Sequence, residues 1–241
     1  FSSLASGRRI PTIPRMVRPL RLALLALVST ISVASADHVI LTGGPAMRKF
    51  EDLRVPQDQH DRWWANFVRA STLRMDEIRK AYPGNEQIVW MVYRPGYQER
   101  GAEDRQPYTT WIGDIARKRN ISLVWVDSTS SLISSLNARP SGSVTTFDYF
   151  GHSNSHCFML DYGNLIMGAC TAGLHEKDLP KVKSSIFAKN SYCKSWGCHT
   201  AESMSGNWKS AFGTKLEGAM GKTDYTVVGK GQLPLGEDWV R

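Results

Sequence analysis

Short apolar runs alternate along the chain with segments whose apolar residues recur at helical spacing. Runs of this kind, closed by Gly, Pro or polar residues, are typical of buried strands. They predict strands at 38–44, 87–96, 121–127, 143–154, 185–197 and 224–231. The segments between them predict helices at 58–82, 108–120, 130–140 and 205–221. Strands that alternate with helices pair in parallel through right-handed crossovers, so the pattern predicts an α/β fold, a three-layer sandwich with a mostly parallel sheet.

Two stretches of this pattern carry more detail. The helix predicted at 58–82 has Asp58 or Asp61 as its candidate N-cap and ends at Pro83-Gly84. Between Asn154 and Asn190 the pattern is less regular, and "CFMLDYGN" predicts a short hairpin arm while "HEKDLPKV" predicts a helical turn.

Residues 1–36 do not follow this pattern of strands and helices. Residues 16–36 read "MVRPLRLALLALVSTISVASA", a basic region, an apolar run of about a dozen residues and a small-x-small exit, which is typical of a secretory signal peptide. A membrane span needs roughly 20 apolar residues, so an anchor is the weaker alternative. We therefore predict that residues 1–36 are a leader whose true start is Met16, with cleavage after Ala36, and that residues 37–241 form a single domain.

Removing the leader changes what the charge implies. The whole chain has a formal net charge of +8, and residues 1–36 contribute five arginines and no acid, so the remainder carries +3. The basic balance is thus largely a property of the leader and predicts no nucleic-acid partner. No second apolar stretch is long enough to span a bilayer, and the predicted mature protein is exported, either periplasmic or extracellular. The oligomeric state does not follow from the sequence.

The four cysteines, Cys157, Cys170, Cys193 and Cys198, are too few for a disulfide scaffold. Export permits disulfides, and four cysteines allow three pairings. Cys193 and Cys198 are five residues apart and point to opposite faces of an unbroken strand, so they are not expected to pair with each other. A bridge from Cys157 to Cys170, or from either to Cys193, stays open.

Two chemically useful side chains end predicted strands. "FDYFGHSN" places His152 at one strand end, and "SYCKSWGCHTA" places Cys198 at another, 46 residues later. Reactive groups of open α/β sheets collect at the carboxyl ends of strands. A neutral imidazole there can accept a thiol proton or hold a thiolate. The Cys198 amide, at a strand-to-helix junction, can donate to an oxyanion.

This arrangement resembles the caspase-like (clan CD) cysteine peptidases, most closely bacterial members with a "GHG"-like stretch followed by an "xGCxxA" stretch. The matching residues here are "FGHSN" and "WGCHTAESMSGNWKSAFG". The resemblance implies that Cys198 is the nucleophile and His152 the catalytic histidine of an exported hydrolase that cleaves a peptide or amide bond. Backbone amides near Ser153 and Gly197 would hold the oxyanion, and no cofactor or metal is implied.

One position departs from the family, because Ser153 follows the histidine where glycine is usual. This favours the competing interpretation, a catalytically dead relative that acts as an extracytoplasmic binding module for a peptide or protein, with Cys198 buried or in a disulfide.

Other nearby residues are weaker candidates. Asp161, Tyr162 and His199 can line a pocket, although a solvated hairpin explains the first two as well. Asp148 lies about 13 Å from His152 along an unbroken strand, too far to orient it. A zinc site is a further alternative, built from zinc-type donors whose spacing matches no closed structural site. Those donors are His152, His156, Cys157, Cys198 and His199.

Overall fold

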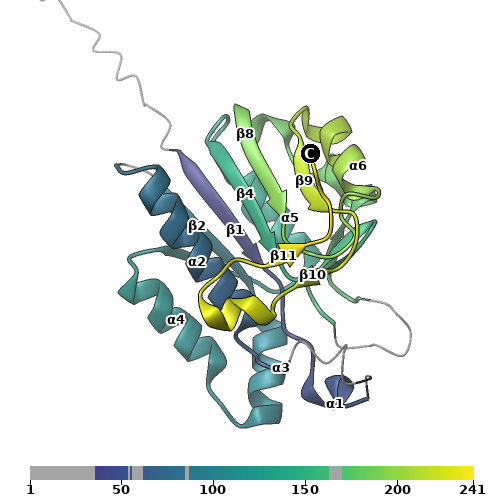
Figure 1. Cartoon of the computed structure of the whole chain (residues 1–241). Coiled ribbons are helices and arrows are strands. Elements are labelled where there is room, and N and C mark those ends of the chain that lie inside the picture. Colours follow the sequence, from purple (N-terminus) through teal and green to yellow (C-terminus); the bar gives the residue numbers. More distant parts are fainter. Residues whose placement is uncertain (1–35, 54, 56–61, 85–86, 163–169) are drawn as a thin grey trace, which may run out of the picture. The chain divides into compact units, whose positions relative to one another are not determined.

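A seven-stranded sheet forms the centre of the structure, which is a computed structural model. The model describes residues 36–53, 55, 62–84, 87–162 and 170–241, and within them the strand order of this sheet is β12-β9-β8-β4-β1-β2-β3 (Figure 1). The strands are β1 (Asp37–Thr42), β2 (Gln87–Tyr93), β3 (Ser122–Val126), β4 (Val144–Phe150), β8 (Phe187–Ser195), β9 (Leu216–Ala219) and β12 (Trp239–Val240). They pair in parallel except at one edge, where β12 runs antiparallel to β9.

Helices cover both faces of this sheet. The core on one face joins strand residues to α2 (Asn66–Ala81) and α4 (Tyr108–Lys118), which contribute Phe67, Val68 and Ile112. The core on the other face includes Leu132 of α5 (Thr129–Asn137) and Trp208 of α6 (Met204–Phe212). The structure therefore confirms the predicted three-layer α/β sandwich with a mostly parallel sheet.

Two helices lie at the ends of the strands. α1 (Arg48–Glu51) follows β1, and α3 (Arg94–Asp104) follows β2 directly, where the strand prediction had run on to Gly96. Pro95 stands in the first turn of α3, a place that suits proline because the first N–H groups of a helix have no partner within it. α3 itself was not predicted.

Two further boundaries predicted from the sequence are wrong in the structure. The strand predicted at 143–154 breaks at Gly151, after which β5 (His152–Asn154) joins β6 (Cys157–Met159) and β7 (Gly173–His175) in a separate three-stranded antiparallel sheet. The helix predicted at 205–221 ends at Phe212, because Gly213 adopts a left-handed φ of 70°, and β9 follows. The hairpin arm predicted at "CFMLDYGN" corresponds to β6.

The strand predicted at 224–231 is also wrong. Only Thr223–Asp224 forms a strand, β10, which pairs with β11 (Leu235–Gly236), and Thr226–Lys230 is a 3₁₀ helix, η4. The Asp224 carboxylate accepts hydrogen bonds from the Thr226 N–H and hydroxyl at 2.7 and 2.9 Å. This local capping competes with extension of the strand, despite the β-branched residues that follow.

The remaining expectations concern the helical turn before β8, the start of α2 and the predicted signal peptide. The helical turn predicted at "HEKDLPKV" is the 3₁₀ helix η2 (Glu176–Lys181), and a second, η3 (Ser184–Ile186), leads into β8. α2 begins at Asn66 rather than near residue 58, and its candidate caps Asp58 and Asp61 lie outside the described residues, as does the predicted signal peptide up to residue 35. Among the described residues, no helix is long and apolar enough to cross a bilayer.

Candidate active site at the ends of β4 and β8

The register of β4 and β8 sets His152 and Cys198 at the same level. Phe147 pairs with Cys193 and Tyr149 with Ser195, an offset of 46 residues (193 minus 147), which is also the separation of His152 from Cys198. The ladder continues past the last pair, because the Trp196 N–H donates to the Tyr149 carbonyl at 2.8 Å. The two side chains thus come from equivalent positions beyond the carboxyl ends of adjacent parallel strands.

His152 and Cys198 also line one small pocket. Its other walls are Gly151, the first residues of α2 (Asn66 and Phe67), Thr223 and Tyr225. These segments follow β1, β4, β8 and β9. The chain crosses from β1 to β2 in one direction along the sheet and from β4 to β8 in the other, so the strand order reverses between β1 and β4. Ligands of open α/β sheets bind at such a reversal of strand order. The cavity volume is about 10 Å³, the room that one water molecule needs.

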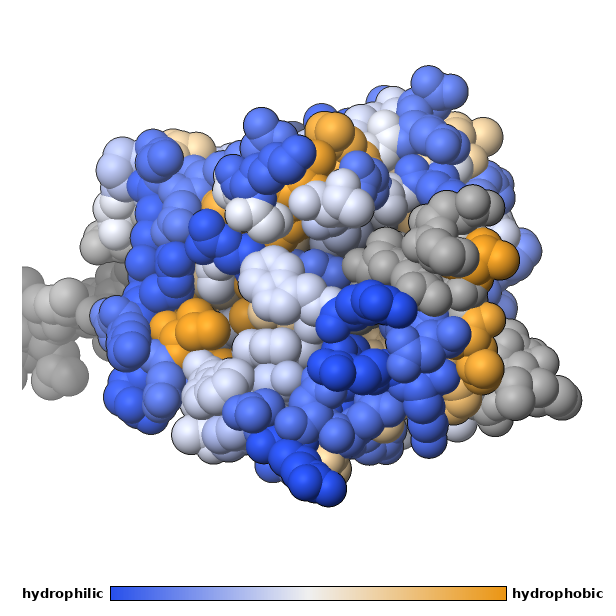
Figure 2. Space-filling model, turned by 60° about the horizontal axis from the view of Figure 1, so that its bottom comes forward, coloured by the Kyte–Doolittle hydropathy of each residue, from blue (hydrophilic) through white to orange (hydrophobic). Residues whose placement is uncertain are grey.

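The surface on this side of the molecule is mostly polar. Figure 2 brings forward the bottom of the view in Figure 1, toward which the parallel strands run, and shows a mainly hydrophilic surface with separate small apolar patches.

Two aromatic rings fix the His152 imidazole. The Phe67 ring meets it edge-on, with centroids 5.0 Å apart and planes at 90°, while the Tyr162 ring stacks on it at 4.2 Å and 18°. Phe67 in turn packs edge-on against Tyr225 at 4.9 Å. Tyr162, a predicted pocket residue, therefore lies against the predicted catalytic histidine.

The Cys198 sulfur accepts a backbone hydrogen bond. The Thr223 N–H donates to Sγ at 3.3 Å, and the Thr223 hydroxyl lies at 3.3 Å from the same atom. Cys198 is half-buried, so a reagent can reach it. The sulfur atom is thus held in place beside the pocket by Thr223.

The residues directly before His152 and Cys198 are glycines, and both positions leave no room for a side chain. A side chain at Gly151 would collide with the Tyr149 hydroxyl, which lies 2.5 Å from the His152 carbonyl, and one at Gly197 would collide with Ser153 Oγ. Ser153 Oγ donates to the Cys198 carbonyl at 2.7 Å, so this side chain links the turn at His152 to the turn at Cys198. The Gly197 N–H donates to Ser195 Oγ at 3.3 Å.

Two of the predicted pocket residues have partners of their own. His199 has a left-handed φ of 62°, and its Nδ1 lies 2.6 Å from Glu202 Oε1. The Asp161 carboxylate accepts the Thr171 N–H at 2.9 Å and the Thr171 hydroxyl. Neither residue is among those that line the described pocket.

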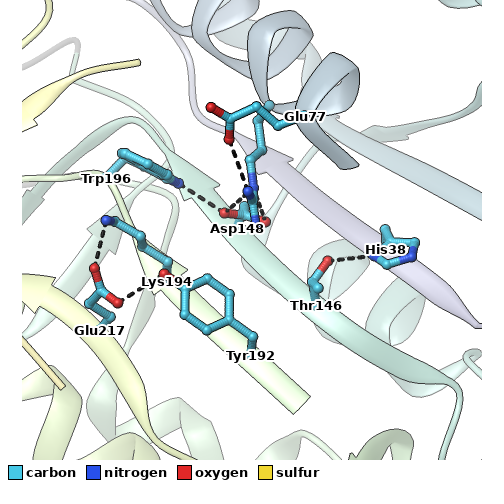
Figure 3. A network of polar contacts seen from close by, with 9 residues as sticks. His38, Glu77, Thr146, Asp148, Tyr192, Lys194, Trp196 and Glu217 are labelled. Carbon is cyan, nitrogen blue, oxygen red and sulfur yellow. Dashed lines mark hydrogen bonds and ion pairs between the residues drawn. The ribbon is translucent and has the colours of Figure 1, made fainter. Parts of the chain in front are cut away.

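A buried ion pair anchors the turn that carries Cys198 (Figure 3). Asp148 on β4 is fully buried, and its carboxylate accepts from Arg74 Nε at 3.0 and 3.1 Å and from Trp196 Nε1 at 2.9 Å. Tyr225 donates its hydroxyl to the Trp196 carbonyl at 3.0 Å. Burial alone would lower the pKa of Arg74, but the Asp148 carboxylate outweighs burial and raises it. Asp148 thus supports the Cys198 turn, and its carboxylate is engaged by groups other than His152.

A second polar pair lies beside this anchor. Lys194 donates to Glu217 at 2.6 Å, and its ammonium group lies 4.1 and 3.9 Å from the ring centroids of Trp196 and Trp239. Figure 3 shows the pair next to Trp196.

The four cysteines are free thiols in three different settings. Cys193 is fully buried in the core, where burial raises its pKa to about 12. Cys157 and Cys170 have their sulfur atoms 3.8 Å apart.

The predicted zinc donors do not gather in one place. His156 Nδ1 lies 3.2 Å from Glu176, His199 contacts Glu202, and Cys157 contacts Cys170. Within the described ranges no group of three or more His, Cys, Asp or Glu residues is arranged to hold a metal ion.

Four residues of the pocket were not identified as site residues from the sequence. Asn66 and Phe67 follow two adjacent tryptophans, and Thr223 and Tyr225 lie in the C-terminal segment, where "GKTDYTVV" is rich in turn residues. No local motif marks these residues, because they reach the pocket only through packing of α2 and of the segment after β9.

Comparison of the chain with protein-family models, with curated proteins and with solved structures finds no match. What the site does is therefore inferred from its geometry and from the resemblance that its motifs carry.

Proposed function

We propose that this protein is a cysteine-dependent hydrolase of the caspase-like type that cleaves a peptide or amide bond. The observation that carries the proposal is the placement of His152 and Cys198 at equivalent ends of adjacent parallel strands, lining one pocket. In an open α/β sheet this is where reacting groups are expected.

Each residue has a defined role in the proposed reaction. The Cys198 thiolate, supported by the Thr223 N–H, attacks the substrate carbonyl carbon and forms a tetrahedral intermediate. Backbone N–H groups near Cys198 and Ser153 hold the oxyanion. His152 gives a proton to the leaving amine, and water then releases the acyl group from sulfur.

The size of the pocket limits what it can hold. With room for about one water molecule, it accommodates the reacting oxygen of a substrate and no substrate side chain. The substrate side chains therefore bind outside it, on the mainly hydrophilic surface of Figure 2. Together with the export predicted from residues 16–36, this favours an extracytoplasmic peptide or protein as substrate.

Screening the full chain against a library of fluorogenic peptide amides, varied at the residue before the scissile bond, tests the proposal. Cys198→Ala is expected to lower kcat/KM by at least about 10³-fold, and His152→Ala by about 10²–10⁴-fold. Cys193→Ala and His175→Ala serve as matched controls that keep the activity. Hydrolysis that survives Cys198→Ala would refute the proposed chemistry.

A second candidate function is a binding module on the same fold. Ser153 favours it, because its side chain fills the space next to Gly197 and bonds to the Cys198 carbonyl. Ser153→Gly restores the family's usual residue and separates the two candidates. An enzyme held back by this side chain gains activity in the variant, whereas a module hydrolyses no library member before or after the change.

A further inference from the structure

Two cysteines outside the proposed site, Cys157 and Cys170, lie close to each other. Cys157 is on β6, Cys170 precedes β7, and their sulfur atoms are 3.8 Å apart. A disulfide bond is about 2.05 Å long, so the two sulfur atoms have to approach each other by less than about 2 Å to form one.

The surroundings make room for a bridge. A side chain at Gly173 would place its Cβ 2.7 Å from Cys157 Sγ and 3.0 Å from Cys170 Sγ, closer than real Cβ contacts allow. The absence of a side chain at position 173 is therefore what lets the two sulfur atoms approach on this side. The backbone at Cys157 is held on both sides, since β6 pairs with both β5 and β7.

The two thiols differ in access and in acidity. Cys157 is 5% exposed and Cys170 is half-buried, so a reagent reaches Cys170 first. The hydrogen bond from the Cys157 thiol lowers the pKa of Cys170, while the same hydrogen bond and burial raise the pKa of Cys157. Cys170 is the better attacking group, because thiol–disulfide exchange proceeds through the thiolate.

We propose that Cys157 and Cys170 are a redox pair that closes to a disulfide in the folded protein. The oxidant is a low-molecular-weight or protein disulfide. The Cys170 thiolate attacks one of its sulfur atoms and expels the other as a thiolate, which gives a mixed disulfide. Cys157 then loses its proton and attacks Cys170 Sγ, which expels the second thiolate. Two protein thiols are oxidised, and one external disulfide is reduced to two thiols.

The bridge reinforces the small sheet that carries His152. Within this sheet Asn154 on β5 is the register partner of Cys157, and His152 is the partner of Met159. Tyr162, which stacks on His152, lies in the chain between the two cysteines. Closing the bridge adds a covalent link between β6 and the residues that lead into β7. The bridge does not depend on Cys198 being a nucleophile.

Disulfide mapping of the full chain tests the pair directly. The protein is reduced, the reductant is removed, and the protein is incubated with oxidised glutathione, quenched in acid, unfolded, alkylated with iodoacetamide and digested. Mass spectrometry is expected to show a peptide pair joined through Cys157 and Cys170, with loss of both alkylated forms together, while Cys193 stays alkylated. The same bridge is expected in Cys198→Ala, so failure of the hydrolase proposal leaves this result unchanged.

Single-cysteine variants check the order of the steps. Cys157→Ser is expected to stop at a stable glutathione adduct on Cys170, and Cys170→Ser to leave Cys157 alkylated without an adduct. Wild-type protein that keeps Cys157 fully alkylated, or that joins either cysteine to Cys193, would overturn the proposal. The wild-type mapping alone decides this if a variant fails to fold.

Discussion

The interior of β8 and the turn that follows it place two cysteines in opposite chemical situations. Cys193 lies in the core with no exposed surface, and burial raises its pKa to about 12. Cys198, five residues later, is half-buried at the strand's end, where it faces a pocket shared with His152 and accepts the Thr223 N–H. The residue type is the same, so the difference between a packing group and a candidate nucleophile comes from position along one strand.

Alkylation rates give the largest expected contrast between these two regions. At pH 7 a thiol with a pKa near 12 is about 10³-fold less ionised than an ordinary one. Iodoacetamide is therefore expected to label Cys198 at least about 10³-fold faster than Cys193 in native protein, as followed by peptide mass spectrometry. In unfolded protein the two rates should converge, and a native ratio near one would contradict the contrast.

Breaking the anchor beneath the turn is expected to cost the most stability. Asp148→Asn removes the buried one of the two carboxylates that contact Arg74 and should lower the free energy of unfolding by about 3–5 kcal/mol, measured by urea titration. Glu77→Gln is the matched control, because Glu77 contacts the same guanidinium from an exposed position and should cost less than about 1 kcal/mol. Equal effects of the two variants would mean that Asp148 is no anchor.

Cys198 is expected to be alkylated faster than Cys193, but its removal should cost less stability. Cys193→Ala opens space in the core next to Trp208 and should lower the free energy of unfolding by about 1–2 kcal/mol. Cys198→Ala, at a half-buried turn, should change it by less than about 0.5 kcal/mol. Thermal and urea unfolding measure both, and a larger loss for Cys198→Ala would assign that residue to packing.

A dependence of stability on acid pH is expected at the Lys194–Glu217 pair. Burial alone would raise the pKa of Glu217, but hydrogen bonds from Lys194 and Tyr192 outweigh burial and lower it below its usual 4.5. A carboxyl group with a depressed folded-state pKa stabilises the fold above its unfolded-state pKa, and this contribution is lost as pH falls through the folded-state value. Glu217→Gln should therefore be less stable than wild type by about 1 kcal/mol at pH 7.

The same measurement at low pH supplies the check. Below pH 4.5 the difference between wild type and Glu217→Gln should shrink toward zero. A difference that is constant from pH 7 to pH 3 would mean that the glutamate charge contributes nothing.

Local patterns were sufficient to predict five strands of the central sheet and the turns that carry His152 and Cys198. Apolar runs at β1, β2, β3, β4 and β8 read directly as buried strands, and glycine beside His152 and Cys198 marked the turns. The pattern failed where short-range capping decided the backbone, as at Asp224 and Thr226, and where Gly213 ended a helix inside an otherwise helical stretch.

The walls of the pocket follow from tertiary packing, which periodicity does not encode. Phe67 and Tyr225 are far apart in the sequence, and neither was predicted as a site residue. Both are buried and line the pocket, where Phe67 packs against His152 and Tyr225 packs against Phe67. Asp148 behaves similarly: its distance along the strand argued against contact with His152, and only the fold reveals its partners Arg74 and Trp196.

The pH dependence of Cys198 alkylation, in wild type and in His152→Ala, tests the central claim that these two residues form a pair. If His152 stabilises the thiolate, iodoacetamide should label wild-type Cys198 at pH 6 about tenfold to a hundredfold faster than in the variant, with the two rates converging above pH 9. His175→Ala should match wild type throughout. Identical profiles for wild type and His152→Ala would show that the histidine does not act on Cys198, and would contradict the account.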